Sequence, residues 1–129
     1  MKNGLIIDAD GTKRWYLNDK LHREDGPAIE CADGTKYWYL NDDLHREDGP
    51  ALEWADGDKE WYLNDKLHRE DGPAVDWVDG DRCWCLNGKE YSEEDYVIEM
   101  QKRKDERTKQ EECLKEIRKF NYKLESLKL

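Results

Sequence analysis

The sequence repeats itself every 23 residues, and this period limits the fold more than any other feature. Trp15, Trp38, Trp61 and Trp84 occupy the same place in successive units. The segment from Trp38 to Gly57 occurs again, nearly unchanged, one period earlier and one period later, and a degraded fourth copy follows at Trp84. A unit this short cannot bury its own apolar face, so neighbouring units stack and cover one another. The sequence therefore predicts a repeat array.

Each unit has the pattern of a β-hairpin. Residues 28–32 alternate in character, Asp33-Gly34 follows, and a run rich in β-formers occupies residues 36–40. A two-residue Asp-Gly link between two such runs is a strong hairpin signal. With Asp33 and Gly34 as the turn residues, Ile29 is expected opposite Trp38. The equivalent expected pairs are Ile6 with Trp15, Leu52 with Trp61, and Val75 with Trp84.

This register assigns the side chains to two faces, because successive side chains of a strand alternate. One face is expected to carry Ile29, Trp38 and Leu40 and to form the core, with a row of tryptophans along the array. The reverse face is expected to carry Ala28, Tyr37 and a row of tyrosines, Tyr16, Tyr39 and Tyr62. Each second strand ends in Asn followed by Asp or Gly, which predicts a tight turn. The later Gly-Pro step predicts a loop or a sheet edge.

We place the repeat array at residues 1–91. Residues 92–129, which follow it, have the pattern of a helix. Ser92 and the acidic residues after it are typical of a helix start, and neither Gly nor Pro interrupts the sequence up to Leu129. Its first turns are expected to cap the sheet. Residues at spacings of four and three then form a short heptad seam. We expect this seam to pair with a second copy of the chain; docking on its own sheet or a frayed end are the alternatives. The seam residues are Cys113, Ile117, Phe120, Leu124 and Leu127.

Charge is concentrated in the repeats. Residues 92–129 contain equal numbers of acidic and basic side chains, so the whole net charge of −10 belongs to residues 1–91. Such a field favours a partner with a basic surface and disfavours direct contact with nucleic acid or anionic lipid. No apolar run approaches the roughly 18 residues of a membrane span. The segment of residues 1–7 is too short for a signal peptide. A cytoplasmic location is the resulting expectation, with reduced cysteines.

The repeated polar residues are not expected to form a catalytic or metal site. His22, His45 and His68 are expected two strands apart, roughly 9–10 Å, whereas two zinc ligands must approach within about 4 Å. A hydrogen bond from each imidazole to the loop backbone or to the neighbouring carboxylate is expected instead. The Asp-Gly-Asp steps lack the later ligands of a calcium loop. Because each unit carries the same groups as the next, we expect no enzymatic activity and no cofactor.

The pattern Trp-x-x-Asn-(Gly/Asp)-Lys-x-His, then Gly, then Asp-Gly, resembles the MORN repeat over residues 4–90. His45-Arg46-Glu47-Asp48-Gly49 stands in place of the usual His-Gly-x-Gly step. The resemblance implies an elongated antiparallel sheet of four stacked MORN-like β-hairpins, hence a mainly β fold with an α-helical C-terminal tail. Arrays of this kind are common in phage, giant-virus and bacterial proteins. The resemblance therefore also implies a small virus-encoded inhibitor or adaptor that acts in the host cytoplasm. Its expected target is a host protein, such as a defence protein.

Three functions are compatible with these features. The first is a non-enzymatic module that binds a basic host protein through its acidic residues and its tyrosine row, and that forms a homodimer through the helix. The second is an acidic mimic of nucleic acid that blocks a DNA- or RNA-binding enzyme. The third is a structural scaffold. The residues expected to bind the partner are Tyr16, Tyr39, Tyr62, Glu24, Asp25, Glu47, Asp48, Glu70 and Asp71.

Overall fold

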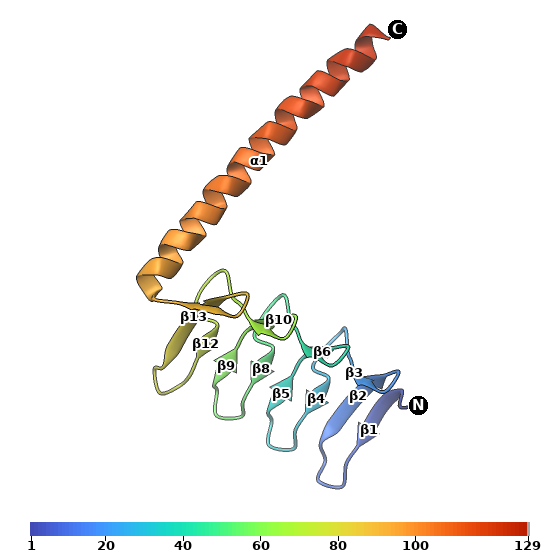
Figure 1. The fold of residues 1–129 in the computed structure, drawn as a ribbon. Coiled ribbons are helices and arrows are strands. Elements are labelled where there is room, and N and C mark those ends of the chain that lie inside the picture. The colour runs from blue at the N-terminus through green and yellow to red at the C-terminus, as the bar shows by residue number, and fades with distance from the viewer. Residues whose placement is uncertain (129) are drawn as a thin grey trace. The chain divides into compact units, whose positions relative to one another are not determined.

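The chain folds into antiparallel β-hairpins followed by a single C-terminal helix, which confirms the predicted fold class (Figure 1). The structure is a computed structural model and describes residues 1–128. Two compact units make up the chain, Met1–Glu93 and Glu94–Leu129. The last residue of the expected helical segment, Leu129, lies outside the described residues.

The main sheet grows by two strands for each sequence unit. Its hairpins follow one another side by side in chain order, from β1 at one edge towards β13 (Figure 1). All of these pairings are antiparallel. The strands, in their order across the sheet, are β1 (Gly4–Ile7), β2 (Lys13–Leu17), β4 (Ile29–Glu30), β5 (Lys36–Tyr37), β8 (Leu52–Glu53), β9 (Lys59–Glu60), β12 (Val75–Asp76), β13 (Arg82–Leu86) and β14 (Lys89–Tyr91).

A second, shorter hairpin follows the first in every unit. Its turn residues Asn41 and Asp42 have φ angles of 49° and 67°. Positive φ at both central residues defines a type I′ turn, whose twist matches that of the flanking strands. The predicted tight turn is therefore confirmed. The second hairpins pair β2 with β3 (Lys20–Leu21), β6 (Tyr39–Leu40) with β7 (Asp43–Leu44), β10 (Tyr62–Leu63) with β11 (Lys66–Leu67), and β13 with β14.

The predicted register of the first hairpin is wrong by one residue. Ile29 lies opposite Tyr37, not Trp38. The loop has three residues, closed by a hydrogen bond from the Cys31 N–H to the Thr35 carbonyl. Gly34 has a φ of 97°, as in a type I turn followed by a left-handed residue. Asp33 is not left-handed; its carboxylate accepts a hydrogen bond from the Thr35 N–H at 2.9 Å, which lowers the pKa of Asp33.

The same shift occurs in every unit. Ile6 pairs with Arg14, Leu52 with Glu60, and Val75 with Cys83, in place of the predicted tryptophan partners. A shift of one residue moves a side chain to the other face of a sheet. The aliphatic residues of the first strands therefore share a face with the tyrosines, not with the tryptophans. The predicted face is therefore wrong for the first-strand residues such as Ile29, whereas Trp38 and Tyr37 lie on opposite faces as predicted.

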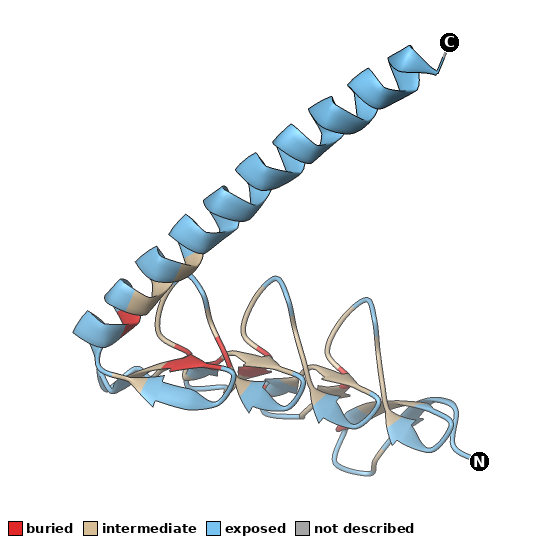
Figure 2. Cartoon of the chain, turned by 45° about the horizontal axis from the view of Figure 1, so that its top comes forward, coloured by how far each residue is buried: buried red, intermediate tan, exposed pale blue. Residues whose placement is uncertain are grey.

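The best-buried residues are not the tryptophan row either. Ala28, Ala51 and Ala74 are completely buried, and Leu52 and Val75 nearly so. Figure 2 shows the buried residues of the hairpin array as short red segments on and beside the strands. The four tryptophans of the predicted row are only half-buried; of the leucines predicted beside them, Leu86 is buried and Leu17 is exposed. Each alanine follows the Gly-Pro step, and Ala74 shows how it joins two units: its N–H donates to the Cys83 carbonyl of its own unit at 2.8 Å, and its carbonyl accepts from the Trp61 N–H of the preceding unit at 2.7 Å. Small side chains permit this close approach of neighbouring units.

The turns of the second hairpins connect neighbouring units. The Asp42 N–H donates to the Leu21 carbonyl at 2.9 Å, and the Leu21 N–H donates to the Asp42 carboxylate at 2.6 Å. Asp65 and Leu44 repeat the exchange one unit later. Before the first unit, the Lys2 carbonyl accepts the equivalent bond from the turn, so this segment satisfies the turn as a preceding unit would. These bonds set the spacing between units along the array.

The C-terminal unit is one continuous helix, α1 (Glu93–Leu127). It begins directly after Ser92, the predicted N-cap position. Glu99 and Arg103, one turn apart, form an ion pair at 3.1 Å. Within residues 1–128, no helix combines the length and the apolar character that a bilayer span requires. The side chains of the heptad seam lie exposed on α1: Cys113, Ile117, Phe120, Leu124 and Leu127.

Candidate interaction surface

The loop that joins one unit to the next is organised by an arginine. The Arg46 guanidinium lies over the Trp38 ring, 4.0 Å from its centroid. Its Nε donates to the Asp48 carboxylate at 3.0 Å, and its Nη1 donates to the Pro50 carbonyl at 3.0 Å. Cation–π contact and charge-assisted hydrogen bonds thus act on one side chain. We call the equivalent segments 22–27, 45–50 and 68–73 the acidic loops.

Gly49 completes this packing. A Cβ added at Gly49 would lie 2.9 Å from the Arg46 Cζ, closer than side chains normally approach. The same 2.9 Å separates Gly26 from Arg23 and Gly72 from Arg69. A side chain at this glycine would therefore displace the guanidinium that passes over it. The arginines were missed as site residues, although an arginine stands three residues before the glycine in each of the three acidic loops.

The histidines connect adjacent units. His45 Nδ1 accepts a hydrogen bond from the Asn64 N–H of the next turn at 3.0 Å, and His22 accepts the equivalent bond from Asn41. Because Nδ1 accepts, the neutral ring carries its proton on Nε2, which lies 3.5 Å from the Glu47 carboxylate. The predicted contact with the neighbouring carboxylate is present, while the backbone partner belongs to the next unit. Among residues 1–128, no His, Cys, Asp and Glu cluster is arranged to hold a metal.

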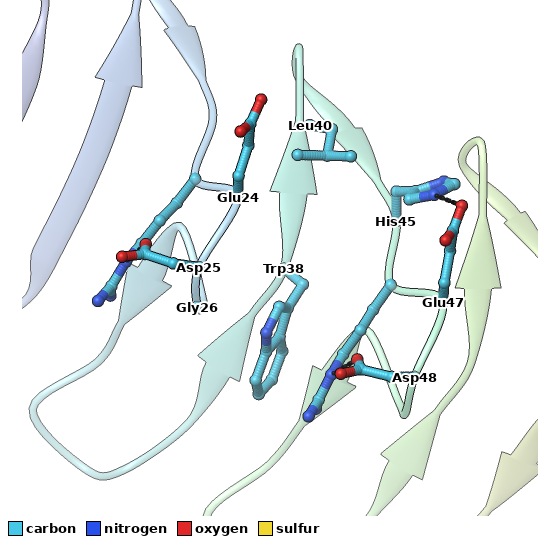
Figure 3. Close-up of a pocket in the computed structure, with 10 residues that line it drawn as sticks. Glu24, Asp25, Gly26, Trp38, Leu40, His45, Glu47 and Asp48 are labelled. Atoms are coloured by element: carbon cyan, nitrogen blue, oxygen red, sulfur yellow. Dashed lines mark hydrogen bonds and ion pairs between the residues drawn. The ribbon is translucent and has the colours of Figure 1, made fainter.

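Two clefts open between successive acidic loops. The first cleft, of about 670 Å³, lies between loops 22–27 and 45–50, with Trp38 and Leu40 between its walls (Figure 3). The second cleft, of about 450 Å³, lies between loops 45–50 and 68–73, with Trp61 and Leu63 in the equivalent places. Arg46, Glu47 and Asp48 line both clefts. The same surface is therefore presented twice, one unit apart.

The clefts contain the six predicted acidic residues. Glu47 is 83% exposed, and its contact with His45 leaves most of its carboxylate in solvent. Asp48 is 88% exposed although it pairs with Arg46. These carboxylates are available to a partner because the fold uses only part of their hydrogen-bonding capacity. The acidic residues that line the two clefts are Glu24, Asp25, Glu47, Asp48, Glu70 and Asp71.

The tyrosines of the predicted site belong to a different surface. Tyr37 and Tyr39 flank Trp38, and their rings stack with centroids 6.3 Å apart, so both point away from the side of Trp38. None of Tyr16, Tyr39 and Tyr62 lines a cleft. We call the side of the sheet that carries these rings the tyrosine face. The predicted partner site thus divides into two surfaces, one acidic and one aromatic.

Polar groups of the tyrosine face are partly buried. The Tyr62 hydroxyl donates to the Glu60 carboxylate at 3.4 Å. Burial, together with this carboxylate, raises the pKa of Tyr62 to about 12, and burial also raises the pKa of Glu60. Burial likewise raises the pKa of the Cys83 and Cys85 thiols, and both cysteines are unpaired, as predicted. Raised thiol pKa values disfavour the reactive thiolate.

Comparisons of the chain with protein-family models, with curated proteins and with solved structures give no match.

Proposed function

We propose that the chain is a non-enzymatic protein-binding module whose acidic loops engage a partner with a basic surface. The observation that carries this proposal is the repeated cleft, in which exposed carboxylates stand on both sides of a tryptophan and a leucine. Apolar floors combined with charged rims are typical of protein recognition sites, where aromatic side chains supply affinity and charges supply specificity.

The acidic loops suit this role because their framework is rigid and their outer carboxylates are accessible. Arg46 holds its loop through Asp48, Pro50 and Trp38, so little conformational entropy is lost when a partner binds. Glu47 contributes little to this framework and lies 83% exposed. The tyrosine face offers a second, less charged contact area, since tyrosine is enriched at protein interfaces.

The helix supplies the proposed homodimer. Ile117, Phe120 and Leu124 are 49%, 62% and 43% exposed on α1. Pairing with the same seam of a second copy removes this apolar surface from water, at about 25 cal/mol per Å² buried. A dimer also joins two sets of clefts, which strengthens binding to a partner with several basic segments through avidity. An inhibitor or adaptor that acts on a host protein is the form of this function that the resemblance to viral arrays favours.

The nucleic-acid mimic is the weaker alternative. Neighbouring units lie two strands apart, about 9.6 Å at ~4.8 Å per strand, whereas duplex DNA carries a phosphate about every 3.4 Å along each strand. Arg46 also offsets part of the charge of its own loop. The acidic loops therefore present a sparser charge pattern than a nucleic-acid backbone.

Affinity capture from the native cellular background tests the proposal. The probes are the full chain, the variant Glu24→Gln/Glu47→Gln/Glu70→Gln, and a control with the same change in charge on the helix, Glu106→Gln/Glu111→Gln/Glu112→Gln. We expect a discrete protein to be retained by the first and third and lost from the second. Retention by all three contradicts the proposal. Displacement of the captured protein by duplex DNA supports the mimic, and recovery of the chain alone supports the scaffold.

A further inference from the structure

The spacing of the two clefts limits the backbone conformation of what occupies them. One sequence unit adds two strands to the main sheet, so equivalent points of neighbouring units are about 9.6 Å apart at ~4.8 Å per strand. The first and second clefts are related by one such step, because Trp38 and Trp61 hold the same place in each. A segment that fills both clefts must present similar side chains on one side at this interval.

A polyproline II helix meets this requirement. It has three residues per turn and a rise of about 3.1 Å per residue, so residues i and i+3 project to the same side about 9.3 Å apart. In a β-strand every second side chain projects to the same side, so side chains on that side are about 6.6 Å or 13 Å apart. Neither distance matches the spacing of the clefts. An α-helix presents the same side after one turn at about 5.4 Å and after two turns at about 10.8 Å. The left-handed extended helix matches most closely.

The residues of the clefts determine the chemistry of the projecting side chains. Each cleft has two glutamates and two aspartates on its walls, against two arginines that already pair with the aspartates. Glu47 and Glu24 face the first cleft with 83% and 84% of their side chains exposed. The tryptophan beside these carboxylates offers an aromatic surface to a long aliphatic stem or a guanidinium.

We propose that the two clefts bind a proline-rich segment in the polyproline II conformation, with arginine or lysine at positions i and i+3. One basic side chain enters each cleft, between the outer carboxylates and beside Trp38 or Trp61. This inference rests on the proposed function and specifies its ligand. Both clefts are used by one segment, so the spacing of the basic residues decides affinity more than their number does.

Calorimetry on the full chain with three synthetic peptides tests the spacing. The first peptide is Arg-Pro-Pro repeated three times. The second has the same composition with arginine at every second position, and the third is an alanine-based helix with three arginines along one face. We expect the first to bind about fivefold more tightly than either other peptide, because one exposed ion pair contributes up to about 1 kcal/mol. Equal affinities, or tighter binding of the second or third, overturn the inference.

Two charge variants test the location. Glu47→Gln alters a wall that both clefts share, and Asp43→Asn removes an equal charge from an exposed position of β7 that lines neither cleft. We expect Glu47→Gln to weaken the first peptide about fivefold and Asp43→Asn to leave its affinity unchanged; equal losses overturn the inference. Far-ultraviolet circular dichroism checks that both variants fold. Captured protein that depends on the acidic loops, together with equal peptide affinities, would refute the spacing and leave the proposed function standing.

Discussion

The packing of Arg46 over Gly49 predicts that one substitution has opposite effects in two backgrounds. Gly49→Ala places a methyl group 2.9 Å from the Arg46 Cζ. Gly49 does not have a positive φ, so the backbone itself accepts alanine. The conflict is resolved when the guanidinium moves, and it then leaves the Trp38 ring and the Pro50 carbonyl.

The size of the effect follows from these contacts. Loss of the cation–π contact costs about 1 kcal/mol, and loss of the charged hydrogen bond to Pro50 costs about 1.5–3 kcal/mol. Alanine returns about 0.4–1 kcal/mol because it restricts the unfolded chain. Gly49→Ala should therefore lower the free energy of unfolding by about 2 kcal/mol, which corresponds to a fall in Tm of about 10 °C for an array of this size.

Urea denaturation followed by tryptophan fluorescence measures this effect in a double-mutant cycle. In the Arg46→Ala background the guanidinium is absent, so Gly49→Ala should be neutral or should stabilise by about 0.4–1 kcal/mol. An equal destabilisation in both backgrounds would show that the glycine is required by the backbone, and the proposed role of Arg46 would be wrong.

Three further predictions concern the tyrosine face and the helix. Because the pKa of Tyr62 is raised to about 12, its contribution to stability should be lost as the pH rises from about 10 to 12. In a pH titration followed by phenolate absorbance, the ionisation step at the highest pH should be absent from Tyr62→Phe. Because burial raises the pKa of Glu60, Glu60→Gln should raise Tm at neutral pH, and the gain should shrink on acidification as Glu60 becomes protonated. In sedimentation, the proposed dimer should become a monomer in Ile117→Asp, whereas the exposed Glu116→Gln should sediment as the unchanged chain does.

The hairpin turns illustrate what the sequence determines. Asn41-Asp42 pairs two residues that tolerate positive φ, and this composition correctly predicted a tight turn; the observed φ angles make it type I′. The Asp33-Gly34 sequence is equally compatible with a two-residue turn. The Asp33 carboxylate, however, accepts a hydrogen bond from the Thr35 N–H, which favours a three-residue loop. Only the position of the left-handed residue distinguishes the two loops. This difference of one residue places Ile29 on the tyrosine face instead of the predicted tryptophan face.

The candidate site shows a similar division. The exposed carboxylates were predicted from charge alone, and they line the clefts. The structural role of Arg46 was not predicted, because a basic residue between Glu and Asp residues is usually a solvated surface residue. Its position depends on Trp38, eight residues earlier, and on Gly49, three residues later. That packing arises from the path of the loop, which the alternation of residue types does not encode.

The indole N–H resonances of the six tryptophans offer the most direct test of the clefts as the binding site. The full chain is titrated with the Arg-Pro-Pro peptide while these signals are followed by NMR. Trp38 and Trp61, which line the clefts, should shift together and saturate at one peptide per chain. Shifts confined to Trp54 and Trp77, which line neither cleft, would place binding elsewhere and contradict the account.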